Sequence, residues 1–143
     1  MRSIFIDINK IQESSVTFLP LTWGSFDYEL LKWSRENSDL QLDSIIAADI
    51  FYDSRDFDSI LATVDFLFKR HKCSELLTAY HERDERHNLQ QLMNKWSFKG
   101  ELMDANPYIT QQIVSDIFRF DQNYAERFLD DAHNIKLYKI TRA

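Results

Sequence analysis

The sequence predicts an α/β fold in which buried strands and amphipathic helices alternate. Ser44–Phe51 is an apolar run broken by one acid, Asp49, and such a run is typical of a strand buried on both faces of a parallel sheet. From about Ser54 to Lys72, apolar residues recur every three or four positions, which predicts a helix. Glu75–Tyr80 is a second buried-strand candidate. The order strand, helix, strand therefore indicates a βαβ unit.

Three further patterns extend this alternation toward the carboxyl end. A second amphipathic helix is predicted by apolar residues at Leu89, Leu92, Met93 and Trp96. After a break at Asn106-Pro107, a third helical pattern runs through Ile109, Ile113, Val114 and Ile117. The closing segment Ile135–Ile140 alternates apolar and polar residues, which predicts a half-exposed strand.

The segment before the βαβ unit is predicted to contain one more strand. Val16–Trp23 is rich in β-branched and aromatic residues, as strands are. Because Pro20 lacks an amide donor, this strand could pair only at a sheet edge. Between Ser25 and Asp43 we expect a short helical turn followed by a surface loop.

The composition is that of one globular domain or a piece of one. The 143 residues are 44% apolar and 14% aromatic, which is enough to bury a single core. With 23 acidic against 17 basic side chains, the net charge of -6 disfavours direct binding of nucleic acid and favours a basic protein partner, although such acidity is also common among soluble proteins. No apolar run is long enough to span a membrane. The single Cys73 excludes an internal disulfide, so we expect a cytoplasmic or nuclear protein.

The glycine content limits the ligands that these residues can hold. Gly24 and Gly100 are the only glycines, and neither lies in a glycine-rich pattern. A loop that cradles phosphate or a dinucleotide therefore cannot be built from this sequence. The acids and histidines from His81 to His87 fit no helical metal motif, so no metal site is expected.

Two strand ends carry the residues best suited to chemistry, because open α/β sheets bind ligands outside the carboxyl ends of their strands. Leu21–Gly24 finishes in the flat ring of Trp23, and in Ala47–Tyr52 small residues precede an acid. Asp49 and Tyr52 could hydrogen-bond a basic amine or guanidinium and orient it for attack on an electrophilic methyl group. Each ring could equally be a packed core residue, whereas an acid that ends an apolar strand needs a partner or solvent.

The pair of motifs LTWG at 21–24 and AADIFY at 47–52 resembles the LxWG and D/E-x-x-Y/F motifs of the family-sixteen protein methyltransferases. The continuation, in 53–67 and again in 88–96, is similar in particular to the methyltransferase-like protein 23 branch. The resemblance runs from about Ile8 to Met103, and beyond it only the general plan of a helix and a closing strand is shared. Each motif alone is weak, but their order and spacing make the pair more specific.

This resemblance implies a seven-β-strand, Rossmann-like fold and transfer of a methyl group from S-adenosylmethionine to a lysine or arginine of another protein. In the similar branch the activity is associated with histone arginine. By the same resemblance, Trp23 would contact the adenine of the cofactor, and Ala48 would be the small residue against it. Asp49 and Tyr52 would be the catalytic acid and aromatic residue at the substrate.

The resemblance also implies parts that this sequence does not contain. The family's glycine-rich loop and the acid that holds the cofactor ribose should precede Val16, where fifteen residues without glycine stand. In the family's strand order, three-two-one-four-five-seven-six, the strand at Val16–Trp23 is an edge that reaches the strand at Ser44 only through strands one and two. We therefore expect residues 1–143 to be the C-terminal part of one methyltransferase domain that lacks the first two strands. Its S-adenosylmethionine site would be incomplete, and the strand carrying Asp49 would have an exposed edge.

Two functions from different classes follow from these expectations. The first is a protein methyltransferase, present as a truncated chain that is inactive by itself. The second is a non-catalytic remnant or protein-interaction module that keeps an acidic groove but cannot hold the cofactor. Arginine and lysine both stay open as the target side chain, as does the oligomeric state.

Overall fold

The computed structural model confirms the mixed α/β architecture. It describes residues 12, 16–81, 89–105, 107, 109–119, 123–124, 127–128 and 134–143. Four strands form one sheet in the order β1-β2-β4-β3. The first pair is parallel and the other two pairs are antiparallel. The bounds of the strands are β1 Ser44–Ala48, β2 Glu75–His81, β3 Phe98–Met103 and β4 Ile135–Arg142.

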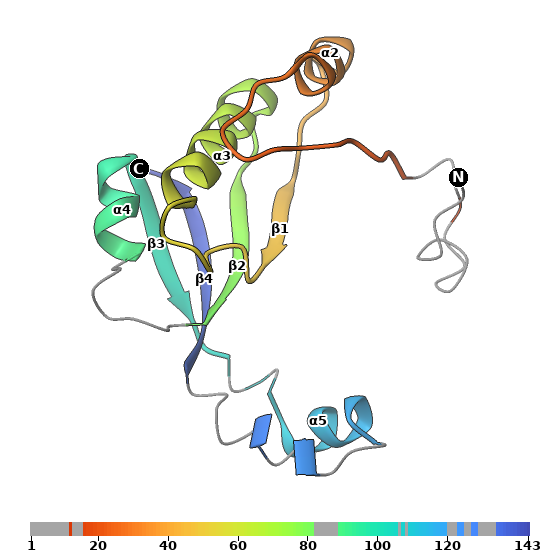
Figure 1. Cartoon of the computed structure of the whole chain (residues 1–143), viewed down its shortest axis with the longest axis vertical. Helices are drawn as coiled ribbons and strands as arrows, with labels where there is room; N and C mark the ends of the chain where they lie inside the picture. Colours follow the sequence, from red (N-terminus) through yellow and green to blue (C-terminus); the bar gives the residue numbers. More distant parts are fainter. Residues whose placement is uncertain are drawn as a thin grey trace.

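The helices of the described residues lie in three places around this sheet (Figure 1). Helices α3 and α4 lie against the sheet, α2 lies beside one end of α3, and α5 lies beyond the end at which β1 and β2 finish. None of the described helices is long and apolar enough to cross a membrane. Their bounds are α2 Tyr28–Glu36, α3 Phe57–His71, α4 Leu89–Lys95 and α5 Gln111–Ile117.

The core lies between one face of the sheet and the apolar stripe predicted for α3. Ile60, Leu61 and Val64 of this helix are buried. They share one cluster with Leu76 of β2 and Ile140 of β4, which are paired across the sheet. Full burial of such a side chain contributes about 1.5–3 kcal/mol, so this stripe alone accounts for a large part of the stability.

The opposite face of the sheet is open at β1, and the prediction that this strand is buried on both faces is wrong. Ile46 is 80% exposed, because the core formed by the described residues lies on the face to which Leu76 points. Strand β1 is also an edge strand, since β2 is its only partner among the described residues. The edge position agrees with the exposed edge expected for the strand that ends at Asp49.

The predicted strand at Val16–Trp23 is wrong: this segment contains no strand. It ends in a turn in which the Ser25 amide donates to the Thr22 carbonyl oxygen at 3.0 Å. Gly24 has a φ of 72°, and its amide donates to Thr63 Oγ1 of α3 at 2.8 Å. The segment is therefore attached to α3, and within the described part of the chain no strand pairs with Val16–Trp23.

The helical turn expected after Ser25 is a nine-residue helix, α2. The Asp27 side chain caps it by accepting a hydrogen bond from the Leu30 amide at 3.0 Å. Ser34 is buried and lies 3.0 Å from Nε2 of His71, whose Nδ1 lies 3.2 Å from the Leu40 carbonyl oxygen. That carbonyl can only accept, so Nδ1 carries the proton and donates to it. This buried contact joins α2 and the loop after it to the carboxyl end of α3.

Strand β3 was not predicted, because Gly100 and the charged residues beside it obscure the pattern. Phe98 of this strand is buried in the core. A Cβ at Gly100 would lie 2.3 Å from Cε of Met93, so glycine is what lets α4 approach the strand. Counted along the sheet, β1-β2-β4-β3 is the order that the resemblance implies for strands four, five, seven and six.

Replacing Gly24 by alanine should weaken the attachment of the turn to α3. Alanine loses about 1–2 kcal/mol in the left-handed region, and its Cβ would lie 3.0 Å from Cβ of Ser59. We expect the melting temperature to fall by a few degrees and the amides from Gly24 to Phe26 to exchange faster. The Ser38→Ala variant, at an exposed position after α2, should change neither quantity. Unchanged exchange at Ser25, whose amide closes the turn, would contradict this account in the Gly24→Ala variant.

Candidate functional site

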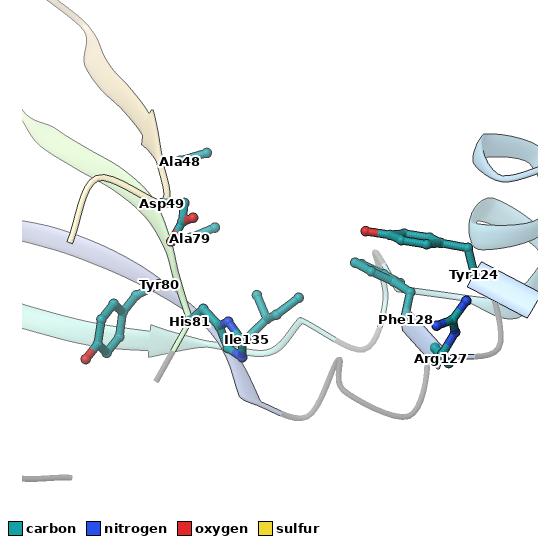
Figure 2. Close-up of a pocket in the computed structure, with 9 residues that line it drawn as sticks. All are labelled: Ala48, Asp49, Ala79, Tyr80, His81, Tyr124, Arg127, Phe128 and Ile135. Carbon is teal, nitrogen blue, oxygen red and sulfur yellow. The ribbon is translucent and has the colours of Figure 1, made fainter. Parts of the chain in front are cut away.

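The carboxyl ends of β1 and β2 meet at one end of the sheet, because the two strands are parallel. A cavity of about 530 Å³ opens there, toward the segment that follows α5. This volume is within the range of about 300–1,000 Å³ that is usual for small-molecule sites. Figure 2 shows the residues that line the cavity, namely Ala48, Asp49, Ala79, Tyr80, His81, Tyr124, Arg127, Phe128 and Ile135.

Asp49 is held in an unusual backbone conformation at the rim of β1. Its φ is 49°, in the left-handed region that aspartate tolerates better than most residues. Its amide donates to the Ala79 carbonyl oxygen at 2.9 Å, which continues the pairing of β1 with β2 by one residue. The strand thus ends by turning the acid into the cavity wall, and strained backbone of this kind is common at functional sites.

Two neighbouring acids make their contacts away from the cavity. Arg55 Nη2 lies 2.6 Å from Asp53 Oδ2, and the hydrogen bonds from Arg55 lower the pKa of the Asp53 carboxyl to about 2. Asp58 accepts from Lys95 Nζ at 2.9 Å and from Trp96 Nε1 at 2.7 Å, and these bonds lower its pKa as well. Among these three acids, only Asp49 lines the cavity.

The structure brings two of the four predicted site residues together. Ala48 and Asp49 both line the cavity, whereas Tyr52 and Trp23 are outside its lining. Tyr52 is 62% exposed, and Trp23 is 37% exposed in the turn that Gly24 attaches to α3. Asp49 directly follows the last residue of β1, at the edge of the sheet. The chemical roles of the four residues stay predictions.

Sequence reasoning missed most of the other residues in the lining. Ala79, Tyr80 and His81 end β2, so the rule that ligands bind at strand ends could have found them. No comparable signal marks Tyr124 or Phe128, which reach the cavity through tertiary folding. Within the described residues, no three His, Cys, Asp or Glu side chains form a group that could hold a metal ion. The rest of the acidic and histidine run, from Glu82 to His87, lies outside those residues.

A model of a protein family described as lysine methyltransferase matches residues 3–96 of this chain. The match includes the two motifs, both parallel strands and the α3 helix between them. The cavity residues from Ala48 to His81 lie inside the matched range, and those from Tyr124 to Ile135 lie beyond it.

Curated relatives show the same similarity. The histone-arginine methyltransferase METTL23 of Xenopus laevis is 36% identical over 85 residues, which are 59% of this chain and 33% of that protein. Its namesake in Homo sapiens is 34% identical over 79 residues, 55% of this chain and 38% of that protein. The methyltransferase-like protein 23 of Dictyostelium discoideum is 33% identical over 95 residues, 65% of this chain and 35% of that protein. The matches thus span about a third of these relatives, and no solved structure matches the chain.

The backbone conformation of Asp49 predicts how substitutions there change stability. Asp49→Gly should be at least as stable as the natural chain, whereas Asp49→Ala should be less stable than the glycine variant by about 1 kcal/mol. Urea unfolding of both variants measures this difference directly. As a matched control, Ala48→Gly should lower stability, because glycine within a strand is unfavourable. An alanine variant as stable as the glycine variant at position 49 would show that the left-handed conformation is not maintained.

Proposed function

This chain belongs to the lysine methyltransferase family, and on that premise we propose that it serves methyl transfer from S-adenosylmethionine to an arginine or lysine of another protein. The observation that carries the proposal is the position of Asp49, which lies within the family match and on the wall of a cavity at the carboxyl end of β1. The names of the relatives favour a histone arginine as the target. A nuclear or cytoplasmic location would suit such a substrate.

Asp49 would act on the acceptor side chain. A carboxylate forms charge-assisted hydrogen bonds with a guanidinium or ammonium group and fixes the position of its nitrogen, which must lose a proton when it takes up the methyl group. Correct placement of a nucleophile removes much of the entropic barrier to a transfer reaction. The backbone of Asp49 is left-handed, and its amide donates a hydrogen bond to the Ala79 carbonyl oxygen. Both features restrict the directions in which the Asp49 carboxylate can point.

The cofactor side of the site is less complete than the acceptor side. Membership of a methyltransferase family implies S-adenosylmethionine, which would supply the electrophilic methyl group. Of the two residues predicted to contact it, Ala48 lines the cavity and Trp23 does not. The described residues therefore do not fit a full cradle for its adenosine, and the sequence holds no glycine-rich loop. We propose that these 143 residues alone bind the cofactor weakly and are inactive.

A second candidate is a non-catalytic protein-interaction module. It is favoured because the site has residues for an acceptor side chain but lacks a full cradle for the cofactor. Calorimetry with the purified chain at a high cofactor concentration separates the candidates, because the methyltransferase role predicts weak binding of S-adenosylmethionine and the interaction module predicts none. If S-adenosylmethionine shows no affinity while a basic peptide binds, the interaction module is favoured. If both ligands bind, the methyltransferase role is favoured.

A chimera tests the catalytic proposal, with this chain replacing the matched segment of the human relative. In an active chimera, Asp49→Asn should lower kcat/KM for methylation at least about a hundredfold, because the acceptor is no longer oriented by a charge. Cofactor affinity should change little. Trp23→Ala should mainly weaken cofactor binding. Asparagine is used because it also tolerates the left-handed conformation.

Asp53→Asn is the matched control for this experiment. Its acid is paired with Arg55 and lies outside the cavity lining, so methylation should be nearly unchanged. Near-full activity of the Asp49→Asn chimera would contradict the proposed role of the acid.

A further inference from the structure

The cavity joins a part of the chain that the family shares to a part that the family model does not cover. Ala48, Asp49 and Ala79 lie inside the matched range, and Tyr124 and Phe128 lie beyond it. A property that differs among members of one family is expected to reside in the part that they do not share. The second side of the cavity is therefore the place to look for substrate selection.

This second side is aromatic. The Phe118 ring lies 5.0 Å from that of Tyr124 and 5.4 Å from that of Phe128, measured between centroids, with tilted geometry in both pairs. Figure 2 shows Tyr124 and Phe128 directed toward the strand ends, where Ala48 and Ala79 leave room because their side chains are small. Tyr124 is half exposed, so its ring is accessible to a ligand.

The charges of the lining favour a cation between the two sides. Asp49 is the acid of the lining, on the sheet side. Arg127 belongs to the lining too, but its Nε donates to the Asn123 carbonyl oxygen at 3.2 Å, on the second side of the cavity. A cation placed over aromatic rings and opposite a carboxylate is attracted by both.

We propose that Tyr124 and Phe128 form the wall that selects an arginine side chain, with its guanidinium between these rings and Asp49. The inference rests on the proposed function and names the residues that decide between its two possible targets. A guanidinium is planar and weakly hydrated, so it stacks on aromatic rings while its fork of donors meets a carboxylate. The ammonium of lysine is compact and strongly hydrated, and it gains less from the same wall.

Peptide binding by the 143-residue chain tests the proposal without any methyl donor. The probes are three blocked tripeptides, glycine-X-glycine, in which X is arginine, lysine or the neutral analogue citrulline. Affinity is followed by NMR through the methyl groups of Ala48 and Ala79. The arginine peptide should bind about three- to tenfold more tightly than the lysine peptide, and the citrulline peptide should bind least. Failure of the arginine peptide to bind, or equal affinity for arginine and citrulline, would overturn the proposal.

Variants assign the selectivity to the wall. Tyr124→Leu and Phe128→Leu should each reduce arginine affinity about three- to tenfold and bring it toward that of lysine. Tyr124→Phe should preserve the affinity for arginine and the selectivity over lysine, because the aromatic ring is kept. Ile117→Ala, at an exposed position of α5 outside the lining, is the control and should bind as the natural chain does. A folded Tyr124→Leu variant with unchanged selectivity would overturn the assignment.

Two charge variants test whether the cavity binds a cation or an anion. Asp49→Asn should weaken the arginine peptide, and Arg127→Gln should leave it unchanged or slightly tighter. The reverse pattern would identify an anion site and overturn the proposal. If chimeras bind the arginine peptide selectively but catalyse no methylation, the result would contradict only the proposed function. If active chimeras keep the same preference between arginine and lysine after substitution of Tyr124 and Phe128, the result would contradict only this inference.

Discussion

The burial of Phe51 beneath the ends of β1 and β2 is the contact on which the candidate site depends. This ring meets Phe57 edge-on at 5.3 Å and Tyr80 edge-on at 6.5 Å, between centroids. It therefore ties the segment after β1 to the first turn of α3 and to the end of β2. Asp49 lies between this anchor and the strand pairing, so its backbone is fixed on both sides. With Phe51 turned inward, its neighbour Tyr52 is left at the surface.

Strand β1 is supported on one side only by the described residues. On one side of the strand, β2, α3 and the core give Asp49 a rigid support. On the other side, the described residues place no strand, and Ile46 is exposed on the open face. Of the residues assigned to the proposed methyltransferase site, Asp49 and Ala48 therefore share one cavity wall, whereas Trp23 lies outside the cavity lining. The sheet order is consistent with part of a Rossmann-like methyltransferase fold.

Elements with strong apolar periodicity were predictable from the sequence. The α3 stripe and the closing β4 strand follow from local patterns, because burial of one face leaves a period of 3.6 or 2 in the residues, and β2 was predicted as a buried-strand candidate. Val16–Trp23 failed for the opposite reason: it has the composition of a strand, yet strand formation needs a partner that composition does not supply. Strand β3 was missed because glycine is unusual inside a strand. Gly100 is suited to this position because it leaves space for the Met93 side chain.

The candidate site was predictable only where strand ends determine it. Asp49 and Ala48 follow from the rule for carboxyl ends of strands, and the structure places both on the cavity. Tyr124 and Phe128 could not be predicted, because about 75 residues of chain separate them from Asp49 and no periodic pattern links the two parts. Their helical turns reach the cavity through packing with Phe118, a tertiary contact.

Amide-resolved hydrogen exchange along β1 tests most directly the claim that the site lies beside an edge strand that the described residues leave uncovered. Successive residues of a strand direct their amides to opposite edges, and Asp49 donates to Ala79 of β2. The amides of Ile45 and Ala47 should therefore also face β2, and those of Ile46 and Ala48 should face the open edge. The account predicts slow exchange at Ile45, Ala47 and Asp49 and fast exchange at the two residues between them. Equal, strong protection at all five amides would contradict it, because a further strand would then cover the edge.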